Sequence, residues 1–137
     1  IFFGYTFCPD ICPTTMSALT ATMSQLKNNP DVAKDVQVVF VSVDPQRDTI
    51  EKLASYMGYF NKEFTGVTGS RKELDALVSQ AGAGYAIEPE TAPGEYLVSH
   101  TSSIFLINPD GELVASFSQP HYPATIAEQF VQIRELH

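Results

Sequence analysis

Short runs of bulky apolar residues alternate along the chain with stretches in which apolar residues recur every three or four positions. The continuous runs at 1–3 and 36–43 predict strands buried on both faces, as in parallel sheets. Between them, helical spacing over 13–28 predicts a helix that ends at Asn29 and Pro30. Strands and helices in alternation predict an α/β fold with a mixed sheet.

The second half of the chain continues this alternation. A helix is expected from a cap at Asp48 or Thr49 to about Phe60, and a capping box of Ser70 and Glu73 predicts another that ends near Gly82. Further short strands are expected at 64–67, 85–88, 96–99, 103–108 and 112–117, the last two joined by a turn at 108–111. Apolar spacing over 126–133 predicts a final helix.

The size and charge of the chain limit the functions it can have. At 137 residues with 44% hydrophobic content, the chain is expected to form one domain, residues 1–137, with a real core. The net charge of −8 argues against nucleic-acid binding, which needs clustered Lys and Arg. No apolar stretch is long enough to span a bilayer. Because the chain opens without Met inside an expected central strand, we interpret it as a fragment that lacks its N-terminal part.

Both cysteines, Cys8 and Cys12, follow the first expected strand. Pro9 and Pro13 predict a tight loop between them, and Pro13 suits the first turn of a helix. Cys12 would then cap that helix, where the positive end of the helix dipole lowers the pKa of a thiol and favours the thiolate. Two functions use such a pair, namely thiol–disulfide exchange and capture of a soft metal. The alternatives are a structural disulfide or two inert thiols.

Three segments of the chain are similar, in order, to segments of one known family. They are GYTFCPDICP in the dithiol region, VSVDPQRDT over 41–49, and VSHTSSIFLINPDGELV over 98–114. Together they resemble the Sco/SenC family of copper-binding, thioredoxin-like proteins, over nearly the whole chain. The resemblance implies a thioredoxin-like fold, in which a mixed central sheet is flanked by helices and followed by a C-terminal hairpin and helix. It also implies that a membrane anchor or targeting segment precedes this sequence.

His100 lies in a Ser/Thr-rich connection just before an expected strand. A thioredoxin-like fold would bring this connection opposite the dithiol loop. Two thiolates and an imidazole suit Cu(I) or Zn(II), and the residues alone leave both open. The resemblance implies copper, with Cys8, Cys12 and His100 as ligands.

The other residues that could bind a metal are weaker candidates. Asp44 ends a buried strand, where it is either a turn residue or an accessory group near the metal. His121 and His137 fall outside the matched segments and are expected at the surface. Met16 and Met23 have the spacing of core residues rather than of copper ligands.

The resemblance implies a copper chaperone that helps to assemble the dinuclear copper centre, CuA, of cytochrome c oxidase. Its partners would be the copper-bearing oxidase subunit and also other copper chaperones or thiol reductants. The alternative is a thiol–disulfide oxidoreductase that uses Cys8 and Cys12 alone, and a peroxidase ranks a distant third. We therefore expect a metallochaperone rather than an enzyme. The expected location is the bacterial periplasm, tethered to the inner membrane, in preference to the mitochondrial intermembrane space.

Overall fold

The computed structural model of the protein describes residues 1–8 and 11–136 and shows strands and helices in alternation. The order is β1 (Phe2–Gly4), α1 (Ile11–Leu26), α2 (Pro30–Ala33), β2 (Val39–Ser42), α3 (Ile50–Phe60), β3 (Thr65–Val67), α4 (Arg71–Gln80), β4 (Tyr85–Ile87), β5 (Val98–His100), β6 (Ile104–Ile107), β7 (Leu113–Phe117) and α5 (Pro123–Leu136). Within the described ranges, no helix has both the length and the apolar character needed to cross a membrane.

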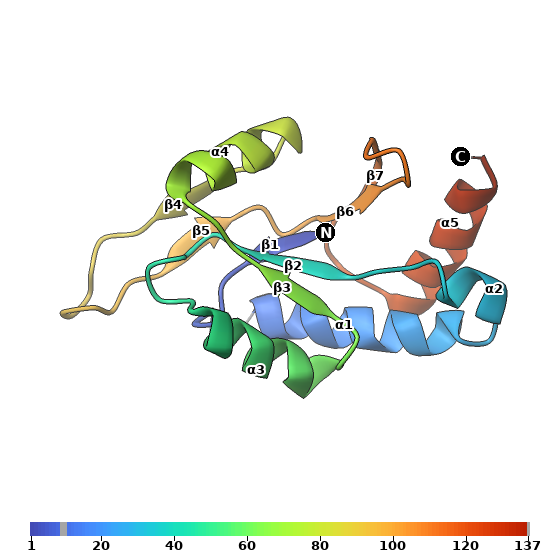
Figure 1. The fold of residues 1–137 in the computed structure, drawn as a ribbon, viewed down its shortest axis with the longest axis horizontal. Helices are drawn as coiled ribbons and strands as arrows, with labels where there is room; N and C mark the ends of the chain where they lie inside the picture. Colours follow the sequence, from blue (N-terminus) through green and yellow to red (C-terminus); the bar gives the residue numbers. More distant parts are fainter. Residues whose placement is uncertain (9–10, 137) are drawn as a thin grey trace.

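Five strands form a mixed sheet in the order β3-β2-β1-β6-β7 (Figure 1). The strands β1, β2 and β3 run parallel, while β6 is antiparallel to β1 and β7 is antiparallel to β6. The strands β4 and β5 pair with each other in a separate antiparallel hairpin. The mixed sheet and the C-terminal hairpin confirm the α/β prediction.

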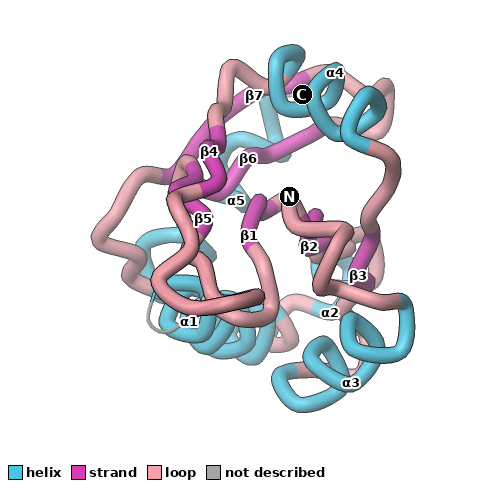
Figure 2. Tube along the Cα trace, turned by 90° about the vertical axis from the view of Figure 1, so that its left-hand side faces the viewer, coloured by secondary structure: helices cyan, strands magenta, loops and turns pink. Residues whose placement is uncertain are grey.

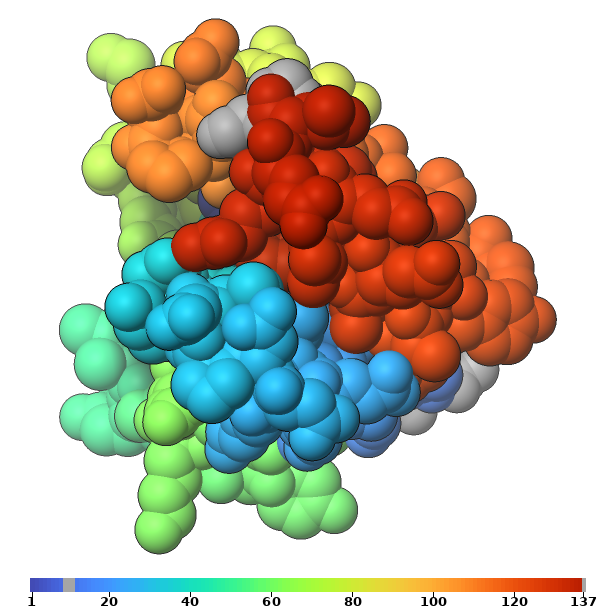
Figure 3. All heavy atoms as spheres, turned by 90° about the vertical axis from the view of Figure 1, so that its right-hand side faces the viewer, coloured from blue at the N-terminus to red at the C-terminus, as the bar shows by residue number. Residues whose placement is uncertain are grey.

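Helices cover both faces of the sheet. In Figures 1 and 2, α1 and α3 lie on one side of the strands and α4 lies on the other. The final helix α5 packs beside α1, and Figure 3 shows it across one end of the molecule next to the turn that follows α1. The core is centred on β1 and β2, where Phe2, Phe3 and Phe40 are at most 2% exposed. Met16 and Met23 are buried in the same core, as expected.

The predicted caps form. Thr49 accepts a hydrogen bond from the Lys52 backbone N–H at the start of α3. Ser70 accepts one from the Glu73 backbone N–H, and its hydroxyl donates to the Glu73 carboxylate, so the side chains of the expected capping box pair at the start of α4. Gly82 follows α4 with φ of 71°, the left-handed conformation that glycine adopts without strain.

Several boundaries differ from the predictions. The strand expected at 36–43 is confined to β2, which pairs with β1 over residues 40–42 and with β3 over residues 39–41. Pro30 begins the short helix α2 instead of only ending α1, since proline also suits the first position of a helix. His100 is the last residue of β5 rather than part of a connection.

Candidate metal centre

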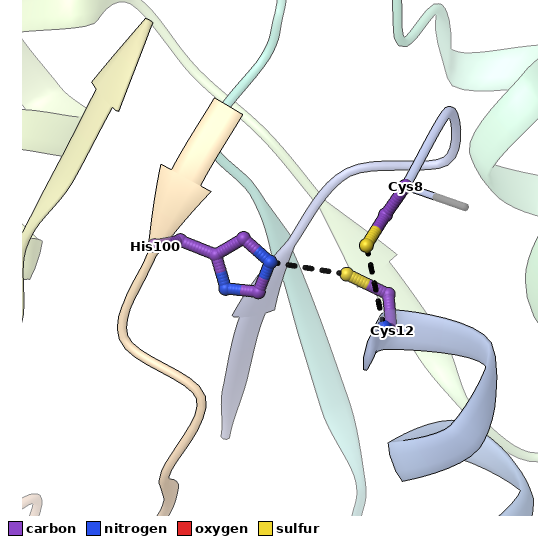
Figure 4. Close-up of side chains that lie close together, drawn as sticks. All are labelled: Cys8, Cys12 and His100. Carbon is purple, nitrogen blue, oxygen red and sulfur yellow. Dashed lines mark hydrogen bonds between the residues drawn. The ribbon is translucent and has the colours of Figure 1, made fainter. Parts of the chain in front are cut away.

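Cys8, Cys12 and His100 meet at one point although they come from three different elements. Their ligand atoms, two sulfurs and one imidazole nitrogen, all lie within 4.8 Å of one another. Cys12 Sγ is 3.3 Å from His100 Nε2, across 88 positions of sequence (Figure 4). The structure thus brings together the three side chains that the sequence singled out.

The two cysteines differ in their surroundings. Cys12 is fully buried, whereas Cys8 is half-buried, and the Cys12 backbone N–H donates to Cys8 Sγ at 3.4 Å. The expected cap position of Cys12 is wrong, because α1 begins at Ile11 and Cys12 lies within its first turn. Pro13 permits this earlier start, since the first backbone N–H groups of a helix have no intrahelical partner.

The protonation of Cys12 also differs from the prediction. Its hydrogen bond with Cys8 and its burial raise the pKa of the thiol above the ordinary value. These effects outweigh the helix dipole, which was expected to lower the pKa. In the metal-free protein Cys12 therefore keeps its proton, and a metal must displace it on binding.

His100 is held with one nitrogen directed at the sulfurs. Its Nδ1 lies 3.1 Å from the Thr101 carbonyl oxygen, which can only accept, so Nδ1 carries the proton and donates. Nε2 is then left as the atom with a free electron pair, and it faces Cys12. The rings of Phe2 and Tyr5 contact the imidazole edge-on, at centroid distances of 5.8 and 5.9 Å. The ring is thus oriented for metal binding before a metal arrives.

Gly4, at the end of β1, makes room for Cys12. A Cβ atom at this position would lie 2.7 Å from Cys12 Sγ and 2.9 Å from Cε2 of Phe40. Any side chain here would force the sulfur out of its present position. In the sequence, Gly4 marked only the end of a strand.

Asp48 anchors the residues that lead to Cys8, a role that no sequence pattern predicted. Its carboxylate is 1% exposed and accepts from the Thr6 backbone N–H at 3.0 Å and the Thr6 hydroxyl at 2.5 Å. It also accepts from the Ser42 hydroxyl at 2.6 Å. Asp48 thereby ties the dithiol loop to the end of β2, while Thr49 caps the following helix.

Asp44 is fully buried and bonded to other side chains. Its Oδ2 accepts from Nε of Arg47 at 2.6 Å, and its Oδ1 accepts from the Tyr96 hydroxyl at 2.7 Å. Burial and this carboxylate raise the pKa of Tyr96, so the hydroxyl keeps the proton that it donates. The metal-binding group found among residues 1–8 and 11–136 does not include Asp44, whose accessory role stays a prediction.

The other histidines are separate from this group. His121 is half-buried rather than at the surface, because both ring nitrogens are engaged. Its Nε2 donates to the Phe117 carbonyl oxygen, and its Nδ1 lies 3.3 Å from the Thr15 hydroxyl. His137 lies outside the described residues.

The geometry of the group fits a soft metal ion. Ligand atoms that share one such ion, at about 2.0–2.3 Å from it, lie roughly 4 Å apart, which the present spacing, from 3.3 Å between Cys12 Sγ and His100 Nε2 up to at most 4.8 Å, reaches with small adjustments. Two sulfurs and one imidazole are a donor set for Cu(I) or Zn(II) rather than for Mg²⁺ or Ca²⁺. A helix-flanked mixed sheet, with this group beyond the end of its central strand β1, defines a thioredoxin-like domain with a candidate soft-metal centre.

The chain belongs to the SCO1/SenC family, whose family model matches residues 1–135. A protein of Stutzerimonas stutzeri named for copper binding is 38% identical over 120 residues, which are 88% of this chain and 57% of that protein. The human mitochondrial SCO1 homolog is 34% identical over 127 residues, which are 93% of this chain and 42% of that protein. The chain therefore spans about half the length of these relatives.

Solved structures share the fold. Arabidopsis thaliana ScoI with copper bound has a TM-score of 0.90 and 32% identity, over 99% of this chain and 83% of that chain. BsSco, a member of the Sco family of cytochrome c oxidase assembly proteins in which a disulfide switch is identified, has a TM-score of 0.70 and 25% identity, over 99% of this chain and 79% of that chain. The predicted thioredoxin-like fold is confirmed.

Proposed function

We propose that this protein is a copper chaperone that binds copper through Cys8, Cys12 and His100 and takes part in assembling the CuA centre of cytochrome c oxidase. The observation that carries the proposal is the meeting of the two sulfurs and His100 Nε2 within 4.8 Å. Three ligands complete a trigonal Cu(I) site, whereas Zn(II) calls for a fourth. The copper-bound relative supports copper over zinc.

The three proposed ligands have different roles in the uptake and release of copper. Cys8, which is half-buried, is the sulfur that an incoming ion or a receiving protein reaches first. Cys12 loses its proton as the ion binds, and the preset Nε2 of His100 supplies the third ligand. On release, thiolates of the receiving protein would replace Cys8 and then Cys12. No bond of a substrate is turned over, so the proposed activity is not that of an enzyme.

A titration of the fully reduced protein with Cu(I), against a chromophoric Cu(I) competitor, tests the proposal. His100→Ala should lower the affinity at least about tenfold, since even partners outside the ligand shell are worth that much. His121→Ala is the matched control, because His121 is also half-buried but, among the described residues, bonds to Thr15 and Phe117 instead of the cysteines, and its loss should leave the affinity unchanged. Equal affinities for the wild type and His100→Ala would remove His100 from the site.

A second candidate function is thiol–disulfide exchange on the cysteines of a client protein. It is favoured by the contact between Cys8 Sγ and the Cys12 backbone and by the disulfide switch of BsSco. This chemistry needs only the two thiols. His100→Ala should therefore retain reduction of a disulfide substrate while it loses copper affinity, and loss of both activities would argue against an independent reductase role.

For partners we propose the copper-bearing subunit of cytochrome c oxidase, together with copper chaperones or thiol reductants that load and reduce the site. For location we propose the bacterial periplasm, at the inner membrane. Similarity to the Stutzerimonas stutzeri protein supports a bacterial setting, and similarity to human mitochondrial SCO1 keeps the intermembrane space as the alternative. Fractionation of cells that produce the full-length protein, followed by protease accessibility, tests this location.

A further inference from the structure

The guanidinium group of Arg47 lies among three aromatic rings beside the metal centre. Its Cζ is 3.6 Å from the ring centroid of Tyr96, 4.8 Å from that of Phe7 and 5.6 Å from that of Tyr5. Its Nε donates to the buried carboxylate of Asp44 at 2.6 Å. Arg47 thus contacts four side chains from three separate segments of the chain.

Two of these segments carry the metal ligands. Tyr5 and Phe7 lead directly to Cys8, and Tyr96 lies just before β5, which ends at His100. The Tyr5 hydroxyl also accepts from the Val98 backbone N–H at 3.1 Å, so the same residues join the dithiol loop to β5 a second time. Arg47 therefore lies at the junction between the two halves of the ligand set.

The contacts depend on the shape of arginine and not only on its charge. The Arg47 side chain is 15% exposed, and its terminal Nη2 is buried without a hydrogen-bond partner among the described residues. Ring faces take the place of hydrogen-bond acceptors there, an arrangement that a flat guanidinium accepts and a compact ammonium does not. A lysine would keep the charge for Asp44 but lose the stacking.

We infer that Arg47 is a positioning residue that holds the dithiol loop and the His100 strand at metal-binding distance in the metal-free protein. This inference rests on the proposed copper function. Arg47 sets this distance before the ion arrives. The two segments therefore lose their conformational freedom when the protein folds, and this entropy cost does not reduce the affinity for copper. Without the stacking, copper would have to draw His100 and the cysteines together itself, and its affinity would fall.

A double-mutant cycle distinguishes this role from a general loss of stability. If Arg47 acts by placing His100 opposite the cysteines, Arg47→Lys should matter only while His100 is present. We expect Arg47→Lys to lower the Cu(I) affinity about tenfold in the wild-type background, a loss between the strengths of an exposed and a fully desolvated cation–π interaction. In the His100→Ala background the same change should lower the affinity less than twofold.

Arg134→Lys is the control for the substitution itself. Arg134 pairs with Asp35 at the surface, away from the ligand-bearing segments, so its change should leave Cu(I) affinity unaltered in both backgrounds. Phe7→Leu is a second test, because Phe7 is 47% exposed and its loss is compatible with folding even if Arg47→Lys is not. Phe7→Leu should lower the Cu(I) affinity about threefold when His100 is present and have a smaller effect in the His100→Ala background.

Equal losses from Arg47→Lys and Phe7→Leu in both backgrounds, or no loss in either, would overturn the inference. Those results would leave the proposed function intact as long as the wild type binds Cu(I) and His100→Ala weakens it. A wild-type protein that fails to bind Cu(I) would instead remove the proposed function, and this inference with it.

Discussion

At the residue scale, the centre depends on small differences between side chains of similar type. Cys12 is buried and keeps its proton, whereas Cys8 is half-buried at the opening of the site. The choice of glycine at position 4 is equally specific, because the Cys12 sulfur occupies the space that a side chain there would need. The meeting of the three ligands therefore depends on the position of the Cys12 sulfur and on the absence of a side chain at Gly4.

Gly4→Ala tests this directly. The added methyl group would collide with Cys12 Sγ and the Phe40 ring, so we expect a loss of roughly 1–3 kcal/mol in the free energy of unfolding. The shifted sulfur should also weaken Cu(I) binding. Urea unfolding and a Cu(I) titration measure the two effects. Gly58→Ala is the control, because Gly58 is exposed in α3 with open space around it, and the change there should be neutral or stabilising. Similar results for both variants would contradict the account.

At the element scale, the helix and strand ends arrange the site while the caps stabilise the scaffold. The end of β1 leads to Cys8, the first turn of α1 carries Cys12, and the end of β5 carries His100. The turn after β2 joins them, with Asp48 bonded to Thr6 and Arg47 stacked against Tyr96. The cap of α4 is expected to act on stability alone, because its hydrogen bonds join Ser70 to Glu73 and, among the described residues, reach none of these groups.

Ser70→Ala should separate stability from metal binding. It removes the acceptor for the Glu73 backbone N–H at the start of α4, and a lost cap costs about 1 kcal/mol. We expect the urea midpoint to fall while Cu(I) affinity stays the same. Ser79→Ala, at an exposed position late in α4, is the matched control and should leave the midpoint near that of the wild type or raise it. A change in Cu(I) affinity for Ser70→Ala would show that α4 influences the site.

The same scale shows what could be predicted from the sequence. Hydrophobic spacing and capping residues predicted most helices and strands, and the resemblance to the Sco/SenC family implied the three candidate ligands. The roles of Arg47 and Asp48 were missed because they arise from tertiary contacts to Tyr96 and Thr6, which no local pattern encodes. The one available signal was their place in the segment 41–49, which resembles a segment of the Sco/SenC family. The protonation of Cys12 was predicted wrongly because the pKa of its thiol depends on the hydrogen bond with Cys8 and on burial in the folded chain, which a helix-start motif does not show.

At the scale of the whole molecule, the fold keeps the Cys12 thiol protonated and the three candidate ligands close together. The folded state keeps the Cys12 proton more tightly than the unfolded chain does. Stability from this group is fully present below the ordinary thiol pKa of 9.0, and it is lost as the pH rises beyond that value, because only the unfolded chain then releases the proton.

The reduced protein should therefore lose unfolding free energy above about pH 9, by up to about 1.4 kcal/mol per pH unit from this one group. Urea unfolding at a series of pH values between 8 and 10, under reducing conditions and without metal, measures the slope. In Cys12→Ser, where position 12 carries no thiol that can ionise, the decline between pH 9 and 10 should be smaller. Burial raises the pKa of Tyr5 and Tyr56 as well, and these groups add to the decline only above their ordinary pKa of 10.0. An equal decline in Cys12→Ser would show that the loss of unfolding free energy does not come from the Cys12 thiol.

X-ray absorption spectroscopy at the copper edge, on the reduced protein loaded with one equivalent of Cu(I), tests the central claim most directly. We predict two sulfur neighbours and one imidazole nitrogen around the ion, with the imidazole signal lost in His100→Ala and kept in His121→Ala. A copper ion bound by sulfur alone in the wild type, or an imidazole signal that persists without His100, would contradict the account.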